Sequence, residues 1–535
     1  MSEPGWYKFY DDKVPRTINQ PEHSIVDIVD KYAESNPKKV IFLCCGRKMN
    51  YRQLADNINN FASSLLSFGI KKGDRICFLL PNLFQFPIVH LSILKVGAIS
   101  VPLNPLLTTH EIEKHIKLCT ARILITIDTC YDKIEKIKET TSIERVIVTQ
   151  ITDYFSFVKK IGYYFKYGNS QKLIDYNGSY SFTELNKMAN SVTKFPDLSM
   201  SDDAMLLSTG GLTGTLKLAT MTHSSLMSNA EQVQLWNLQF RKKKDTMLGA
   251  LPFFHSFGIT LGLHYCLLSG IRLVFMPKYS GQKAITAIKR YKINYFPGVP
   301  AMFSSITKVD KKDLKSLYFC LSGGYKLNRE LQKEFEKNTG VRIIESYGLT
   351  EACPAAISNP LTNNSKTGSV GIPLPSTQAK IINPVTKEEI LNGQEGELII
   401  KGPQVMKGYW KNPKETESTI RDGWLHTGDI AKTDNNKFFY ITGRLKDLII
   451  YGGFNIFPLE VENVLLKHPK IKDVRVSGVE DKKYGELVKA SVVLNYGFDM
   501  NAGELKDFCK KYLAWYKIPR KLEFLPELSK KRIIH

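Results

Sequence analysis

The chain has 535 residues, 43% of them hydrophobic, so it can bury several cores and form more than one domain. Its 74 basic and 52 acidic residues give a net charge of +22, but the lysines are spread along the whole chain and no nucleic-acid-binding motif accompanies them, which argues against a nucleic-acid partner. Nine cysteines without CxxC spacing and a polar, mixed-charge N-terminus disfavour a disulfide scaffold and secretion, and they favour a cytoplasmic protein.

Helical and strand patterns alternate in the first part of the chain. Residues 51–66 form an amphipathic helical pattern, residues 75–80 form an apolar run typical of a buried strand, and a second helical pattern ends at Lys95. The alternation returns between residues 247 and 345. The sequence therefore predicts an α/β fold of layered helices and sheets.

Two segments raise the question of a membrane. Residues 248–274 are apolar over a length that could cross a bilayer, but Pro252 and Arg272 favour a buried strand and helix, with a membrane span as the alternative. Residues 153–167 mix aromatic side chains with lysines, which is typical of a helix at a membrane surface. The alternative for this segment is a surface helix whose aromatic rings pack on the domain.

The composition changes in the last part of the chain. After Gly396 the chain has short strands bounded by glycines, which indicates a β-subdomain, and from about Gly443 a compact unit of strands and helices follows. We therefore predict a large N-terminal domain of layered α/β subdomains plus this β-subdomain over residues 1–443. A small, mobile α+β C-terminal domain over residues 444–535 would complete the molecule.

The first chemical motif runs from Ser208 to Lys217, directly after an apolar stretch. Its glycines let backbone N–H groups approach a ligand, its hydroxyls add donors and its lysine adds a positive charge, a combination that suits a polyphosphate. The motif lacks the GxxxxGK[ST] spacing of a P-loop, which argues against that class of ATPase. An ordinary flexible turn is the alternative.

Three further motifs follow along the chain. Residues 345–351 (ESYGLTE) follow a strand-like stretch, where a carboxylate and a hydroxyl could hold Mg²⁺ and contact a phosphate while the tyrosine stacks on a base. Residues 423–429 (GWLHTGD) place an aspartate on a glycine turn, where it could accept hydrogen bonds from ribose hydroxyls. Residues 443–460 form the fourth motif.

In this order and separation, the four motifs resemble the adenylate-forming superfamily of acyl-CoA synthetases, 4-coumarate ligases, firefly luciferase and the adenylation domains of peptide synthetases. The resemblance covers nearly the whole chain and includes shorter pieces such as Lys72–Asp74, Leu251–His255 and Gly408–Trp410. The phosphate loop and the Pro-Phe-Phe-His run are most similar to those of medium- and long-chain fatty-acyl-CoA ligases. The resemblance implies an enzyme that activates a carboxylic acid with ATP and passes the acyl group to a thiol.

The resemblance also implies roles for individual residues. Thr350 would contact the α-phosphate, Glu351 would bind Mg²⁺, and His255 would line the acyl pocket, although a core histidine is the alternative for the last. Residues that would bind ATP are Ser208, Thr209, Gly210, Gly211, Thr213, Gly214, Lys217, Gly323, Gly324, Tyr347, Gly348, Asp429 and Arg444, with Tyr347 stacked on adenine and Asp429 and Arg444 on ribose. The hinge of the rotating small domain would be Lys446, and coenzyme A would contact Gly452, Gly453, Phe454 and Asn455.

The sequence departs from the family pattern at two places. Leu212 replaces a threonine of the phosphate loop and Leu218 replaces the glycine after the lysine, so one phosphate donor is lost. At the C-terminus the family's Gly-Lys pair is absent, and either Lys531 or Arg532 takes the catalytic lysine position, depending on the alignment. Arginine at that position would not be a conservative exchange, because its planar guanidinium differs from a point-like ammonium.

The leading interpretation is an ATP-dependent fatty acid:CoA ligase, an AMP-forming acid–thiol ligase that uses ATP, Mg²⁺ and coenzyme A. Within the same family, the alternatives are a ligase that loads an acyl carrier protein and one that acts on an aryl acid. From a different class, the alternative is a non-catalytic pseudoenzyme that binds a nucleotide or a lipid. Peripheral membrane contact through residues 153–167 is the further expectation.

Overall fold

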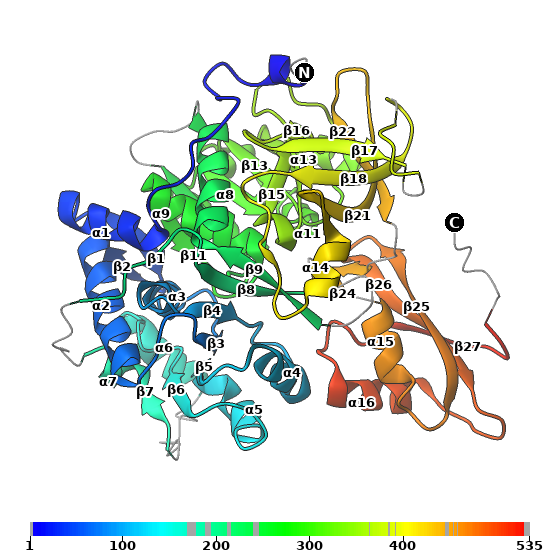
Figure 1. Ribbon diagram of the computed structural model, residues 1–535, viewed down its shortest axis with the longest axis horizontal. Coiled ribbons are helices and arrows are strands. Elements are labelled where there is room, and N and C mark those ends of the chain that lie inside the picture. The colour runs from blue at the N-terminus through cyan, green and yellow to red at the C-terminus, as the bar shows by residue number, and fades with distance from the viewer. Residues whose placement is uncertain are drawn as a thin grey trace.

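The computed structural model describes residues 4–167, 178–187, 194–210, 216–238, 245–362, 364–383, 386–390, 392–444, 449–452, 454–456 and 458–528. A large body adjoins a smaller C-terminal unit, which is coloured orange to red at the lower right of Figure 1. The mixed α/β fold that the sequence predicts is confirmed. The boundary between residues 443 and 444 stays a prediction, and the last strand of the body ends beside it, at Arg444.

Two large sheets form most of the body. The first has the strand order β19-β9-β8-β4-β3-β5-β6-β7 and is parallel except around β9, while the second has the order β16-β15-β14-β13-β12-β10-β11-β1-β2 and is parallel except at its two ends. The strands of the first sheet are β3 Arg75–Leu79, β4 Ile99–Pro102, β5 Ile123–Ile127, β6 Arg145–Thr149, β7 Tyr180–Ser181, β8 Asp203–Gly210, β9 Leu216–Thr222 and β19 Gly408–Tyr409. The strands of the second are β1 Val40–Cys44, β2 Arg47–Asn50, β10 Thr246–Gly249, β11 Arg272–Phe275, β12 Tyr295–Gly298, β13 Phe319–Ser322, β14 Arg342–Gly348, β15 Ala355–Ser358 and β16 Ile372–Pro373.

Burial on both faces explains why these strands read as continuous apolar runs. In β3, Ile76 and Phe78 belong to the core that the two sheets share, whereas Cys77 and Leu79 belong to a second core on the opposite face, as the two-residue period of a strand requires. Helices in the shared core are α1 Ile25–Ser35, α2 Tyr51–Ser67, α3 Gln85–Lys95, α7 Phe182–Leu185, α8 His223–Trp236 and α9 Tyr265–Ser269. Helices on the outer faces are α4 Thr109–Cys119 and α5 Tyr131–Glu135 on the first sheet, and α10 Gly281–Tyr291, α11 Pro300–Ser304, α12 Lys311–Leu314 and α13 Arg329–Thr339 on the second.

A third, antiparallel sheet and the C-terminal unit each have a core of their own. The third sheet has the order β17-β18-β21-β20, with β22 also paired to β21, and the unit has the order β24-β23-β26-β25, with β27 also paired to β26. Elements of the third sheet region are β17 Gln378–Ile382, β18 Gly396–Lys401, α14 Pro413–Thr419, β20 Ile420–Arg421, β21 Trp424–Thr433 and β22 Phe439–Arg444. Elements of the unit are β23 Ile449–Tyr451, β24 Phe454–Ile456, α15 Pro458–Leu465, β25 Ile471–Asp481, β26 Gly485–Leu494, α16 Ala502–Tyr512 and β27 Lys521–Phe524.

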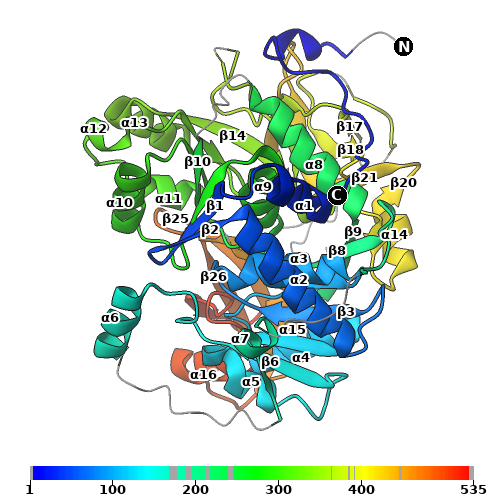
Figure 2. The same cartoon turned by 90° about the vertical axis from the view of Figure 1, so that its left-hand side faces the viewer.

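The two segments with a possible membrane role have different structures. Residues 248–274 contain the end of β10, a π-helix over Gly258–His264, α9 and the start of β11, so the expected buried strand and helix are confirmed. Among the described helices, none is both long and apolar enough to cross a bilayer. Residues 157–167 form helix α6, which lies at the edge of the molecule at the left of Figure 2.

Candidate active site

A cavity of about 1920 Å³ lies where the large sheets, the third sheet and the C-terminal unit meet. Both large sheets contribute residues at the carboxyl ends of their strands, which is where open α/β sheets bind ligands. The structure brings residues of all four sequence motifs to this one cavity. Those that line it are Ser208, Thr209, Lys217, His255, Gly323, Gly324, Tyr347, Gly348, Thr350, Glu351, Asp429, Arg444, Gly452 and Phe454.

Of the remaining predicted site residues, two lie in described strands and the others lie outside the described part of the chain. Gly210 is the last residue of β8, and Asn455 lies in β24. Residues that lie outside the described part of the chain are Gly211, Thr213, Gly214, Lys446, Gly453, Lys531 and Arg532, together with Leu212 of the phosphate loop.

The predicted ribose and adenine residues are joined directly to one another. The Tyr347 hydroxyl donates a hydrogen bond to Asp429 Oδ2 at 2.6 Å, and Arg444 Nε lies 2.9 Å from Asp429 Oδ1. Burial raises the pKa of Asp429, and the positive charge of Arg444 and the bond from Tyr347 oppose that rise. Both carboxylate oxygens therefore have partners, which fixes the position of the side chain.

The structure corrects the sequence interpretation at two of these motifs. Asp429 lies inside β21 rather than on a turn, because the strand continues past Gly428 and pairs with β22 opposite Arg444. Strand β14 likewise extends through Gly348 instead of ending at Ile344, because its last residues pair with β15. Extended backbone on both strands holds Tyr347 and Asp429 side by side.

The predicted phosphate lysine belongs to a second connected group. The buried Lys217 forms an ion pair with Glu415, and its Nζ lies 5.0 Å from the centre of the Tyr409 ring. The Tyr409 hydroxyl in turn donates to Glu351 Oε1 at 2.9 Å. Glu415 and Tyr409 were not among the predicted site residues; the only sequence signal for Tyr409 is its place in the Gly408–Trp410 piece of the family pattern.

His255 lies in a more apolar part of the cavity. Its ring packs at 4.8 Å from that of Phe254 and at 6.2 Å from that of Phe454, which comes from the C-terminal unit. Burial lowers the pKa of His255 to about 4, so the ring is neutral at neutral pH. Its Nε2 is buried and has no hydrogen-bond partner among the described residues.

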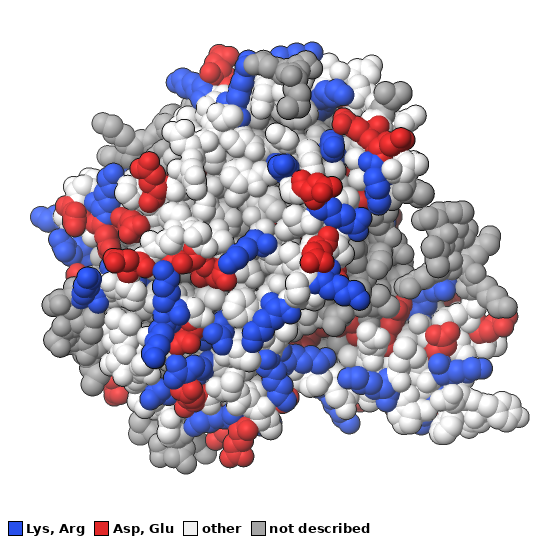
Figure 3. All heavy atoms as spheres, in the orientation of Figure 1, with Lys and Arg blue, Asp and Glu red and all other residues white. Residues whose placement is uncertain are grey.

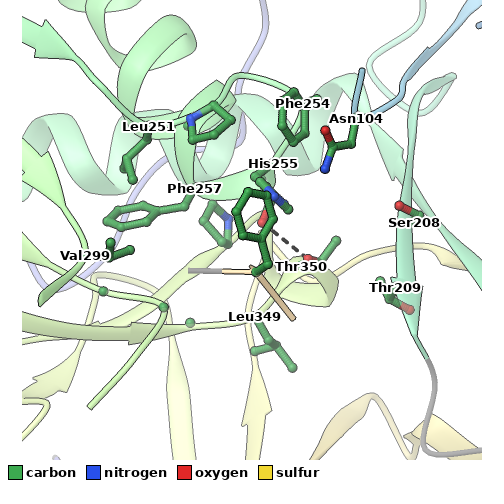
Figure 4. Close-up of a pocket in the computed structure, with 18 of the residues that line it drawn as sticks. Asn104, Ser208, Thr209, Leu251, Phe254, His255, Phe257, Val299, Leu349 and Thr350 are labelled. Carbon is green, nitrogen blue, oxygen red and sulfur yellow. Dashed lines mark hydrogen bonds between the residues drawn. The ribbon is translucent and has the colours of Figure 1, made fainter. Parts of the chain in front are cut away.

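The labelled side chains of Figure 4 separate into two ends. Phe257 lies beside Val299 at the left, and Ser208 and Thr209 lie across the pocket at the right. Between them the Ser256 and Thr350 hydroxyls are 3.3 Å apart. We call the part of the cavity with Phe257, Val299 and His255 the apolar end, and the part with the ion-paired Lys217 and Asp429 the polar end.

Glycines are needed where the backbone approaches its neighbours. A Cβ on Gly323 would lie 3.1 Å from the Phe257 ring, and one on Gly348 would lie 2.0 Å from the Pro354 carbonyl oxygen. Gly324 has φ +76° and Gly452 has φ +54°, which are left-handed conformations that favour glycine. The Gly452 N–H donates to the Tyr484 carbonyl at 2.7 Å, which fixes the turn before Phe454.

Comparisons with known proteins identify the family of the chain. Residues 29–410 match the family model of the AMP-binding enzymes, and residues 460–533 match that of the AMP-binding enzyme C-terminal domain. The chain therefore belongs to the family of AMP-binding enzymes, and the resemblance seen in the sequence is confirmed.

Individual relatives are similar over nearly their whole length. The long-chain-fatty-acid–CoA ligase of Bacillus subtilis is 35% identical, with 99% of this chain and 96% of the relative covered. Among solved structures, a double mutant of the o-succinylbenzoate CoA synthetase of Bacillus subtilis with its product analogue OSB-NCoA is 28% identical and has a TM-score of 0.80, with 94% and 96% covered. The same synthetase in complex with the acyl-adenylate OSB-AMP, also 28% identical, has a TM-score of 0.67, with 94% and 95% covered.

Proposed function

We propose that the chain is an ATP-dependent fatty acid:CoA ligase that works through an acyl-adenylate. One observation carries the proposal: a single cavity contains the polar end, the apolar end and Phe454 of the C-terminal unit. ATP, a carboxylic acid and a thiol could therefore meet in one place. The fatty acid as substrate is supported by the name and the 35% identity of the Bacillus subtilis relative.

The reaction would have two steps. A carboxylate oxygen of the acid forms a bond to the α-phosphorus of ATP while the bond to the bridging oxygen breaks, which releases pyrophosphate. The thiolate of CoA then attacks the carbonyl carbon, and AMP leaves with the electron pair of the broken bond. Thr350 would donate to the α-phosphate, Asp429 would accept from the ribose hydroxyls, and Lys217 would leave Glu415 to approach the outer phosphates.

Mg²⁺ would be bound through Glu351. Its side chain is an oxygen donor at the cavity, and Mg²⁺ commonly takes one or two carboxylates, with waters and substrate phosphates as its other ligands. No group of three or more metal-ligating His, Cys, Asp or Glu occurs among the described residues, so the nucleotide itself would supply most ligands. The ion would neutralise charge that develops on the phosphate oxygens.

The orientation of the C-terminal unit suits the second step. Phe454 and Gly452 both line the cavity, and the Phe454 ring lies 6.2 Å from that of His255, where the thiol of CoA would arrive. The TM-score is also higher for the relative bound to a CoA product analogue than for the same relative bound to an acyl-adenylate, 0.80 against 0.67. In the other orientation Lys531 or Arg532 would reach the cavity, with Lys446 as the hinge.

Exchange of labelled pyrophosphate into ATP tests the first step. We expect exchange that depends on a fatty acid, with hexanoate to stearate as the series. Absence of exchange with every acid, at several protein concentrations, would favour the pseudoenzyme. An aryl acid series, and CoA and an acyl carrier protein added separately, then distinguish the substrate and the acceptor.

We further propose that this enzyme is cytoplasmic and contacts a membrane surface through α6. Phe157 and Phe165 are 78% and 88% exposed, Val158 and Ile161 are exposed between them, and Tyr163 on the opposite side packs on Phe155. The helix therefore turns an apolar stripe outward, which is typical of an interfacial helix. Such a contact would bring the enzyme to a source of fatty acids.

Flotation with liposomes tests the membrane contact. We expect F157S/F165S to lose flotation, because it removes two highly exposed rings of α6. The matched control is Y496S/F498S, which removes two exposed rings of the C-terminal unit. Equal flotation of both variants and the wild type would end the proposal.

A further inference from the structure

A buried lysine joins the C-terminal unit to the body. Lys517 Nζ lies 2.9 Å from Glu111 Oε1 and 2.9 Å from Glu460 Oε1. Lys517 and Glu111 are buried, while Glu460 is partly exposed. A buried charge is costly unless it is paired, so the three side chains depend on one another.

The two glutamates have different positions relative to a moving unit. Glu460 lies on α15, in the same unit as Lys517, and stays with it in any orientation. Glu111 lies on α4 of the body, which faces α16 across the boundary in Figure 1. Rotation of the unit therefore separates Lys517 from Glu111 but not from Glu460.

Neighbouring contacts show that this boundary is closely packed. The Tyr512 ring meets the His110 ring edge to face at 5.7 Å, and at another point of the boundary a Cβ on Gly485 would lie 2.9 Å from the Tyr325 ring, so only glycine fits there. Burial alone would raise the pKa of Glu111, but Lys517 and hydrogen bonds from Thr108 lower it overall, so the carboxylate is charged. The contact is thus a charged pair inside a packed interface.

We infer that Glu111 and Lys517 form an ion pair specific to the orientation that brings Phe454 to His255, and that it holds the C-terminal unit there for acyl transfer to the thiol. The inference rests on the proposed function. Both are positioning residues, since they act through the placement of the unit. Losing the pair would lower the population of the transfer orientation without removing any group that contacts the reacting atoms.

Glu111→Gln isolates the pair. Glu111 Oε2 accepts from the backbone N–H and the hydroxyl of Thr108 in a capping box at the start of α4, and glutamine also serves in such a box. The variant therefore keeps the helix start and removes only the charge toward Lys517. Glu460→Gln is the matched control, because it removes the partner that moves with Lys517.

The two half-reactions are measured separately, by pyrophosphate exchange and by single-turnover transfer from preformed acyl-adenylate to CoA. We expect Glu111→Gln to slow transfer at least ~10-fold, because the buried Lys517 loses one of its two charged partners, with exchange unchanged or faster. Glu460→Gln should leave the ratio of the two rates within about twofold of wild type. In a Lys517→Met background, Glu111→Gln should have no further effect on transfer.

The possible results decide the inference. An equal fall of both half-reactions in Glu111→Gln, equal effects of the two glutamine variants, or additive effects with Lys517→Met would each overturn it in favour of a structural role. Unchanged transfer in Glu111→Gln would also overturn it. Wild type that performs exchange but no transfer to CoA would instead refute the proposed acceptor, so the two failures are distinguishable.

Discussion

The two ends of the cavity hold their polar groups in opposite ways. At the polar end Asp429 is fixed by Tyr347 and Arg444, so charges are kept by pairing. At the apolar end His255 has a neutral ring whose Nε2 has no partner among the described residues. Pairing allows a buried group to stay charged, whereas burial without pairing removes the charge. Substitutions should therefore affect nucleotide binding at one end and acid selection or pH response at the other.

The largest effect is expected from Asp429→Asn at the polar end. Loss of the carboxylate charge leaves Arg444 without its partner and weakens the acceptor for ribose, so we expect the KM for ATP to rise ~100-fold. The KM for the acid should stay within about threefold of wild type. Both KM values are measured by pyrophosphate exchange. An equal rise in the KM for ATP and the KM for the acid would contradict the division of the cavity into two ends.

The second largest effect is expected on the pH dependence of the free energy of unfolding, and it comes from the buried Glu345. Burial raises the pKa of Glu345, on the same strand as Tyr347, to about 7, and its Oε2 has no partner among the described residues. Because the folded state keeps a proton that the unfolded state loses, stability falls as pH rises from about 4.5 to about 7. Relative to Glu345→Gln, wild type should lose ~2 kcal/mol of unfolding free energy between pH 5 and pH 7, measured with urea. Parallel curves for the two proteins would contradict the raised pKa.

His255 should show the opposite pH dependence. Its folded pKa of about 4 lies below the unfolded value near 6.5, so the unfolded state gains a proton first and stability is lost as pH falls through that window. We expect wild type to lose ~2 kcal/mol more than His255→Asn between pH 7 and pH 5. Urea unfolding at both values measures the difference, and an equal loss in both proteins would place the histidine in solvent rather than in a low-dielectric site.

The smallest effect is expected on the preference between two fatty acids, and it tests which residues belong to the apolar end. Gly323→Ala would place a Cβ 3.1 Å from the Phe257 ring, and the shift of that ring should change the relative kcat/KM for two fatty acids of different length by ~3-fold. Adding Phe257→Leu makes room for the methyl group and should restore more than half of the change. An altered KM for ATP without altered acid preference would contradict this assignment.

Local features of the structure were predictable from the sequence, and contacts between distant segments were not. Apolar runs and glycine-bounded motifs identified the strand β3 and the positions of Tyr347 and Asp429, because both signals depend on neighbouring residues. The strand containing Asp429 was mistaken for a turn, since its pairing with β22 is invisible in local composition.

The partners of the charged residues were missed for the same reason. Lys217 pairs with Glu415 and Lys517 pairs with Glu111, and in both cases the chain between them is hundreds of residues long. A periodic pattern reports which face of an element is buried but not which other element covers it. Only the folded arrangement of the sheets decides those pairs.

Strand β19 determines how the chain can be divided. Gly408 and Tyr409 pair with Thr220 and Ala219 of β9, so an edge of the first sheet is completed by a strand about 190 residues downstream. A fragment that ends before Gly408 would contain every other strand of both large sheets and yet present the unpaired backbone of β9, which is a template for association between copies. Soluble expression of a fragment that contains only the two large sheets should therefore require the chain to continue through Tyr409.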